Sequence, residues 1–303
     1  MRAHHVDLTK LSTSILIVAF ASLAGAVVAW FAGAHGLTLG GVPVVVVAAM
    51  LCFGIQWLAY VPAALRQTEH FYDLVGSLTY LTVVGVAVGV RAQAERLDVR
   101  GVVVTALVAV WAVRLGSFLF GRVRRAGVDA RFDLIKRSWH RFLVAWTLQG
   151  LWVFLTLLAA LVMLASPEHR PLGVLDAVGL TLWCVGFAIE VVADRQKREF
   201  RADPANRERW IDTGLWAWSR HPNYFGEILL WTGVFLAGLG AFDRGATLAV
   251  LSPIFVFMLL RFGSGVPILE ERADARWGGQ PAYEAYKART PILVPWMPRS
   301  PSA

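Results

Sequence analysis

The feature that most constrains this chain is a series of apolar segments about 20 residues long. Helices of that length match the hydrocarbon thickness of a bilayer. Lipid offers the backbone no hydrogen-bond partner, so only helices or closed barrels can span it, and segments this long favour helices. Candidate segments lie at 11–33, 41–63, 71–90, 101–120, 143–165, 172–193, 226–240 and 246–262. The seventh segment is short, so the sequence predicts seven or eight spans.

The composition agrees with a membrane protein. Only 17% of the 303 residues are charged and 57% are hydrophobic, whereas about 25% of the residues in a soluble domain are charged. We therefore expect an all-α, polytopic helical bundle that contacts membrane lipids. We divide it into an N-terminal helical region, 1–142, and a C-terminal region, 143–303. The first segment is expected to stay in place as a helix and not to be cleaved as a signal peptide.

The net charge of +8 is explained by the topology of the chain, and we expect no nucleic-acid partner. Basic residues cluster at 122–141, 195–220 and 272–289. With eight spans, the positive-inside rule places these clusters and both termini on the cytoplasmic side. The loop 91–100, which carries Arg91, Arg96 and Arg100, does not fit this topology.

Charged residues gather on one helix face where the sixth segment ends, in "AIEVVADRQKREFRADP". Glu190, Asp194, Lys197 and Arg201 are spaced by four, three and four residues, which places all four on the same face. That face is either a solvated surface with salt bridges or a polar wall that meets a bound anion.

The stretch "SRHPNYFGEILLW" brings polar side chains to the mouth of the next span. Pro222 favours the first turn of a helix, so Ser219 or Arg220 is expected to precede a helix that starts with His221 and Asn223. A helix N-terminus with basic and amide side chains suits a phosphate. Glu227 follows one turn into the membrane, where ionisable groups are usually functional.

The C-terminal segment is amphipathic. Arg261 ends an apolar run, "GSGVP" allows a corner, and Glu270, Glu271 and Arg272 open a polar stretch. Taken by itself, this stretch is typical of a helix on the membrane surface.

Taken together and in this order, these pieces resemble the membrane sterol and steroid reductases. The resemblance rests on "DRQKREFR", a Gly-Leu-Trp turn, "RHPNYFGE", and Glu270–Arg272 followed by Tyr283, Tyr286 and Pro291. It covers about 143–296, and "TLQGLW" is similar to a segment of the steroid 5α-reductases. "FYDLVGSLTYL" suggests a bacterial branch, hence an inner-membrane protein. Isoprenylcysteine carboxyl methyltransferases, which use S-adenosylmethionine, share a version of the Arg-His-Pro-x-Tyr motif.

The resemblance implies a cytosol-facing NADPH pocket. Arginine side chains suit its phosphates, and no G-x-G-x-x-G motif follows a strand here, which excludes a Rossmann domain. Phosphate and ribose would meet Asp194, Lys197 and Arg201, and pyrophosphate or nicotinamide would meet Arg220, His221 and Asn223. The wall would be completed by Tyr224, Glu227, Arg261, Glu271, Tyr283 and Tyr286.

The N-terminal half is expected to hold a lipid-like substrate. Reduction of a C=C bond conjugated to a carbonyl needs a donor for the carbonyl oxygen, and Glu69, Asp73 and Tyr80 share one helix face with Gly76 and Ser77. The small residues leave room either for a ligand or for a neighbouring helix. The histidines show no metal-ligand spacing.

Three functions follow from these features. The first is an NADPH-dependent reductase of a conjugated C=C bond in a steroid-like or other lipid substrate. The alternative is a membrane methyltransferase that uses S-adenosylmethionine, which needs no cations such as Lys197 and Arg201 for phosphates. The third is a transporter or a non-catalytic lipid-binding protein, although no inverted repeat supports transport.

Overall fold

The computed structural model describes residues 8–126, 132–168, 170–241 and 246–297. Seven helical segments of this part are long and apolar enough to cross a membrane: Lys10–Gly33, Val44–Arg66, Tyr72–Gln93, Val99–Gly121, Trp139–Ala165, Val174–Ala202 and Thr247–Trp277. Strand structure within the same residues is limited to the two-residue strands β1 (Thr38–Leu39) and β2 (Val42–Pro43). The protein is therefore an all-α integral membrane protein, as the sequence predicts.

The expected short seventh segment is helix α7 (Pro222–Leu239). It has 18 residues but carries Pro222, Asn223, Tyr224 and Glu227 in its first two turns. These polar residues keep it outside the group of seven apolar segments. By length and composition the count of candidate spans among the described residues is seven, the lower of the two predicted numbers.

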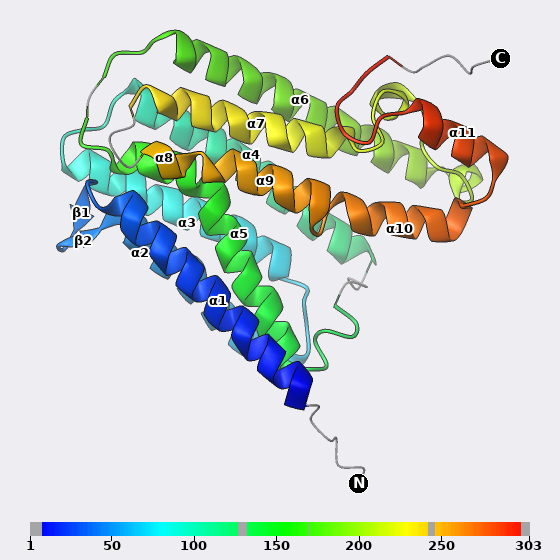
Figure 1. Ribbon diagram of the computed structural model, residues 1–303, viewed down its shortest axis with the longest axis horizontal. Coiled ribbons are helices and arrows are strands. Elements are labelled where there is room, and N and C mark those ends of the chain that lie inside the picture. Colours follow the sequence, from blue (N-terminus) through cyan, green and yellow to red (C-terminus); the bar gives the residue numbers. More distant parts are fainter. Residues whose placement is uncertain (1–7, 127–131, 169, 242–245, 298–303) are drawn as a thin grey trace. The chain divides into compact units, whose positions relative to one another are not determined.

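The chain divides into two compact units, and the first holds the described residues of 1–173 and 238–251. Its helices are α1 (Leu8–Gly33), α2 (Val44–Arg66), α3 (Tyr72–Gln93), α4 (Val99–Ala126), α5 (Trp139–Ala165) and the short α8 (Ala246–Ala249). Helix α5 lies at the centre of this unit, in contact with α1, α2 and α3 (Figure 1). Nearly every residue from Val153 to Ala165 is buried.

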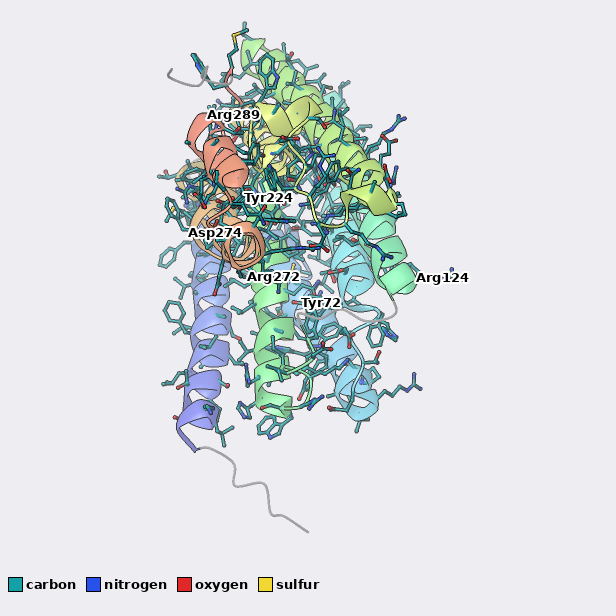
Figure 2. The ribbon with its side chains drawn as sticks, turned by 90° about the vertical axis from the view of Figure 1, so that its right-hand side faces the viewer. Tyr72, Arg124, Tyr224, Arg272, Asp274 and Arg289 are labelled. Carbon is teal, nitrogen blue, oxygen red and sulfur yellow. The ribbon has the colours of Figure 1, made fainter. Side chains whose placement is uncertain are left out.

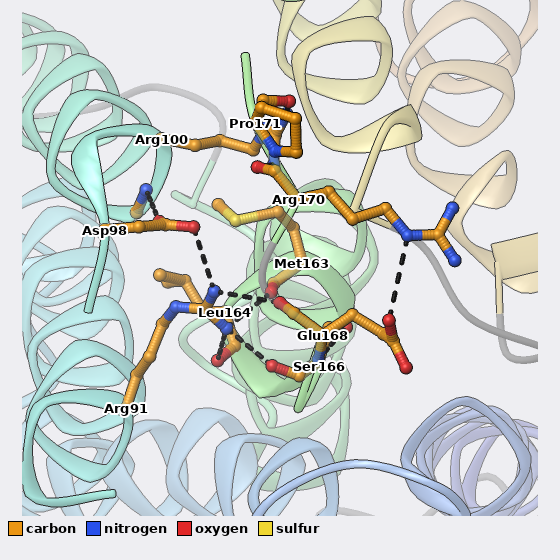
Figure 3. A network of polar contacts seen from close by, with 10 residues as sticks. Arg91, Asp98, Arg100, Met163, Leu164, Ser166, Glu168, Arg170 and Pro171 are labelled. Carbon is orange, nitrogen blue, oxygen red and sulfur yellow. Dashed lines mark hydrogen bonds and ion pairs between the residues drawn. The ribbon is translucent and has the colours of Figure 1, made fainter. Parts of the chain in front are cut away.

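A network of arginine side chains closes one end of the first unit (Figure 3). Arg91 of α3 is fully buried, and its guanidinium donates to the carbonyl oxygens of Ser166 at 2.5 Å and Leu164 at 3.3 Å. It also pairs with Asp98 at 3.3 Å. Arg100 donates to the carbonyl oxygens of Arg170 and Pro171, both at 3.0 Å.

These contacts explain why the 91–100 loop does not fit the charge pattern. The last carbonyl groups of a helix have no partner within the helix, and here Arg91 satisfies those of α5. Asp98 in turn accepts from the backbone N–H of Gly101 at 2.8 Å and caps the start of α4. Arg91 and Arg100 are therefore structural groups with partners inside the protein. The positive-inside rule concerns charges in loops and does not apply to them.

The second unit holds 174–237 and the described residues of 252–303. It contains α6 (Val174–Ala202), the 3₁₀ turns η1 (Pro204–Asn206) and η2 (Gly214–Ala217), α7, α9 (Leu251–Phe262), α10 (Val266–Trp277) and α11 (Pro281–Arg289). Asp274 of α10, labelled in Figure 2, accepts from Lys287 of α11 at 2.7 Å and joins the two helices.

Glycines bring α6 and α7 into backbone contact in the second unit. A methyl group at Gly186 would lie 2.6 Å from the carbonyl oxygen of Gly226, and one at Gly233 would lie 2.5 Å from that of Gly179. Each helix thus places two glycines seven residues apart on the shared face. The helices run antiparallel and side by side (Figure 1), which sets the start of α7 against the polar end of α6.

Candidate functional site

The candidate site lies in the second unit, where the chain turns into α7. Gly214 adopts a positive φ of 60°, which costs glycine little, and this turn lets the backbone N–H of Leu215 donate to Gln196 of α6 at 3.0 Å. Helix α7 then begins at Pro222, whose missing N–H is no loss in a first turn. The predicted position of this helix start is confirmed.

Arg220 and His221 both contact Glu270 of α10. The Arg220 guanidinium forms an ion pair with one oxygen of the Glu270 carboxylate, and Nε2 of His221 lies 2.7 Å from the other. Burial lowers the pKa of His221 below its ordinary value, although the hydrogen bond and charge of Glu270 act in the opposite direction. His221 is therefore neutral at pH 7, with its proton on Nε2, donating to Glu270.

The C-terminal segment fixes the backbone before α7. The N–H of Arg220 donates to the Pro291 carbonyl at 2.9 Å, and Ser219 Oγ donates to the Leu293 carbonyl at 2.7 Å. The Tyr286 hydroxyl donates to the Trp216 carbonyl at 2.9 Å, and burial raises the pKa of Tyr286. Trp216, Ser219 and Arg220 are thus held by α11 and by the segment that follows it.

The end of α6 forms a second wall of the site. Asn223 donates through Nδ2 to Asp194 at 3.2 Å, and the Lys197 ammonium lies 4.6 Å from the centre of the Trp216 ring. Glu190, Asp194 and Glu227 are all buried. The polar face that the 4–3–4 spacing predicts is therefore turned, at Asp194, toward α7.

Three buried polar atoms of this site have no hydrogen-bond partner among the described residues. They are Nε of Arg220, Nδ1 of His221 and Oδ1 of Asn223. One is a donor and two are acceptors, since the proton of neutral His221 lies on Nε2. Buried polar atoms are nearly always hydrogen-bonded in folded proteins, so this group of atoms is what a bound polar molecule would satisfy.

Other predicted residues of this region lie further out or make different contacts. Arg201 is exposed at the end of α6, and Arg261 packs its guanidinium over Phe262 at 4.9 Å. Tyr224 stacks on His221 with the rings 13° apart. Tyr283 is buried, and burial together with nearby acidic groups raises its pKa to about 12.

Sequence reasoning selected Glu271 and missed Glu270. Glu271 is exposed, whereas Glu270 makes both contacts with the Arg-His pair. The only signal in the sequence was the presence of two neighbouring acids, and the phase of α10 decides between them.

The predicted substrate-polarising residues lie in the first unit. Glu69 is buried and pairs with Lys136 at 2.7 Å. Asp73 is half-buried in the first turn of α3. Tyr80 is buried, with its ring edge-on to Trp111 at 5.1 Å between centroids.

The small residues on the same face of α3 are used for helix packing. A methyl group at Gly76 would lie 2.4 Å from Nε2 of Gln149 on α5, and one at Gly116 of α4 would lie 2.4 Å from Oγ of Ser77. Of the two alternatives that the sequence left open, room for a ligand or for another helix, these contacts favour the helix. Among the described residues, no group of three or more His, Cys, Asp or Glu side chains is arranged to hold a metal ion.

Comparison of the sequence with known proteins identifies a family. Residues 59–290 match the model of a family described as a protein of unknown function, DUF1295. The chain belongs to this family. An uncharacterized protein of Schizosaccharomyces pombe is 25% identical over 160 residues, which cover 44% of this chain and 46% of that protein. The chain thus matches less than half the length of this curated relative. No solved structure matches the chain.

The DUF1295 match includes every candidate residue of both units, from Glu69 to Tyr286. It leaves out α1 and the first part of α2. The candidate residues are therefore carried by the part of the chain that defines the family.

Proposed function

We propose that the protein is an NADPH-dependent membrane reductase that acts on a C=C bond conjugated to a carbonyl in a steroid-like or other lipid substrate. The observation that carries this proposal is the group of three buried atoms without partners, Arg220 Nε, His221 Nδ1 and Asn223 Oδ1. They occur within "RHPNYFGE", the segment most similar to the steroid reductases. The same resemblance would place the cofactor on the cytoplasmic side of a bacterial inner membrane.

The side chains present are compatible with a nicotinamide dinucleotide. Such a cofactor presents amide N–H and ribose hydroxyl donors as well as carbonyl and phosphate acceptors. The site offers the complementary set of one donor and two acceptors. When bound, NADPH would supply the hydride, and the chain would bind and orient it through Arg220, His221 and Asn223.

The Glu270 carboxylate favours separate places for the neutral parts of the cofactor and for its phosphates. It balances the charge of Arg220 and accepts from both Arg220 and His221. The negative charge of Glu270 would repel a phosphate at the same place. The two acceptors there, His221 Nδ1 and Asn223 Oδ1, have no proton to donate to it. We therefore assign neutral parts of the cofactor to this place and the phosphates to the basic end of α6, where Lys197 and Arg201 lie one turn apart.

The substrate carbonyl needs a hydrogen-bond donor. Glu69 accepts a hydrogen bond from Lys136, so it is held as a carboxylate and makes a poor donor. This contact leaves Tyr80 and Asp73 of α3 as the candidates. We assign the role to Tyr80, which is buried and whose phenol hydroxyl can donate a hydrogen bond.

A second candidate is a methyltransferase that uses S-adenosylmethionine. The observation that favours it is the acidity of the buried ionisable groups of α6 and α7, namely Glu190, Asp194 and Glu227. Carboxylates stabilise a sulfonium cation and repel phosphates.

One binding experiment separates the two. Detergent-purified protein is titrated with NADPH, NADH or S-adenosylmethionine, and thermal unfolding is followed. We expect NADPH to stabilise by roughly 2.7 kcal/mol at 100 times its Kd, with NADH weaker because it lacks the 2′-phosphate. Arg201→Ala should weaken NADPH by about 1.5–3 kcal/mol and leave NADH nearly unchanged. Stabilisation by S-adenosylmethionine alone would refute the reductase proposal.

A matched variant tests the site itself. Asn223→Ala should weaken NADPH binding, since it removes one of the two acceptors. Asn206→Ala serves as its control, because Asn206 donates only to the Phe200 carbonyl in the turn after α6. Equal effects of the two variants would show that the "RHPNYFGE" segment is a structural helix start.

A further inference from the structure

A small cavity lies in the first unit, between α1 and α5. Its volume is about 170 Å³, and it is lined by Ser14, Ile15, Val18, Ala19, Trp139, His140 and Leu143. All of these are apolar side chains except Ser14 and His140, which are themselves buried. The two polar residues therefore form the one polar feature on the cavity wall.

The two polar groups bond each other in a defined way. Oγ of Ser14 lies 2.8 Å from Nδ1 of His140 and 2.9 Å from the carbonyl oxygen of Lys10. A hydroxyl has a single proton, and a carbonyl can only accept, so Ser14 donates to Lys10. Nδ1 must then carry the proton and donate to Ser14. The neutral ring is thus fixed in the tautomer whose Nε2 is an acceptor.

Helix packing explains only half of this arrangement. A Ser-His hydrogen bond joins α1 to α5, and that accounts for Nδ1. Among the described residues Nε2 of His140 makes no hydrogen bond, although the side chain is more than nine-tenths buried. The ring lines the cavity, and its Nε2 is an acceptor that no other described residue uses.

The cavity is large enough for one ring. An apolar cavity of about 150 Å³ holds a benzene molecule, and this one is slightly larger. Two of the residues that line it, Ile15 and Trp139, are 55% and 54% exposed, so the cavity is open to the surface of the unit. A ligand could therefore place a ring in the cavity and leave an alkyl tail in the bilayer.

We infer that this cavity binds a lipid whose terminal ring carries a hydroxyl group, with the hydroxyl donating to Nε2 of His140. The apolar wall selects the ring, the single acceptor selects the hydroxyl, and Ser14 holds the imidazole in the accepting tautomer. Ser14 lies outside the DUF1295 match, which starts at residue 59. The inference does not depend on the proposed reductase activity.

The test compares two probes, of which the second carries a methyl group in place of the hydroxyl proton and so has no donor. Protein labelled with ¹⁵N-histidine is purified in detergent at pH 8, where an ordinary histidine is neutral, and is titrated with 4-octylphenol or with 4-octylanisole. The ring-nitrogen signals of His140, assigned by their loss in His140→Phe, report the binding. We expect a saturable shift of Nε2 with the phenol and roughly fivefold weaker binding of the anisole.

Two variants complete the test. His140→Phe should bind both probes with equal affinity in a thermal-shift titration. Ala19→Phe adds a ring at a residue that lines the cavity and leaves Ser14 and His140 in the chain, and it should abolish binding of both probes. Leu16→Phe is its control, since it adds the same ring to an exposed position of α1 outside the cavity. Equal affinity of the two probes for the unchanged protein, or unchanged binding in Ala19→Phe, would overturn the inference.

Discussion

Nε2 of His221 lies 2.7 Å from Oε1 of Glu270, and yet burial keeps the pKa of His221 below its ordinary value. The carboxylate stabilises the charged imidazole, but the cost of removing that charge from water is larger. The folded protein therefore holds His221 neutral at a pH where the unfolded chain takes up a proton.

The first prediction is a loss of stability in acid. The folded pKa of His221 lies below the unfolded value of about 6.5, so between these two values the unfolded chain binds more protons. The contribution is complete above about pH 6.5 and is lost as the pH falls through that window. Thermal unfolding between pH 7.5 and 5 should show a steeper loss for the unchanged protein than for His221→Gln. His35→Gln, at an exposed position, should retain the steep loss.

The second prediction concerns the glycine contact between α6 and α7. Gly186→Ala places a methyl group against the Gly226 backbone and should cost about 1–3 kcal/mol by overpacking. Gly89→Ala is the matched control, because a methyl group there meets no atom within 4 Å and alanine favours the helix. Denaturant or thermal unfolding of both variants measures the difference. Equal free energies of unfolding for the two variants would mean that the close contact between α6 and α7 does not contribute to stability.

The third prediction concerns the arginine that caps α5. Arg91→Gln removes a buried cation that satisfies several carbonyl groups and pairs with Asp98. We expect a loss of about 3 kcal/mol. Arg96→Gln removes the same charge from an exposed neighbouring position and should change stability by less than about 0.5 kcal/mol. Equal losses would show that the total charge of the loop matters and the network does not.

The fourth prediction separates structure from chemistry at Glu69. Lys136→Met should be strongly destabilising, by roughly 3–5 kcal/mol, because it leaves Glu69 buried and unpaired. Adding Glu69→Gln should recover part of that loss, with a coupling energy of about 1–3 kcal/mol. Additive losses in unfolding experiments would mean that the two side chains act independently, and Glu69 would again be a candidate acid.

The sequence predicts the helices well because each needs only a long apolar run, and lipid leaves few alternatives. It also predicts the start of α7, since proline at Pro222 acts through local geometry. It does not predict Glu270 over Glu271. That choice depends on where α10 starts, and a shift of one residue turns a side chain by about 100° around the helix.

The role of Arg91 could not be predicted for a different reason. Its partners at Met163, Leu164 and Ser166 are backbone carbonyls, and every residue type has one. No pattern of side chains therefore marks such a contact in advance. The glycines of α6 and α7 carry only a weak signal in their seven-residue spacing, which corresponds to about two helical turns.

The buried guanidinium of Arg91 also has a consequence for how the chain is made. Its carbonyl partners begin 72 residues later, and a ribosome needs about 4–14 s to add that many residues. During this interval α3 has reached the membrane with a cation whose carbonyl partners have not yet been synthesised, and among its described partners only Asp98 can pair with it. Such a charge is costly in hydrocarbon, so that end of α3 stays at the water interface until α5 arrives. The insertion of α3 is therefore completed only after α5 has been synthesised. A nascent chain that stops before Ser166 cannot complete it.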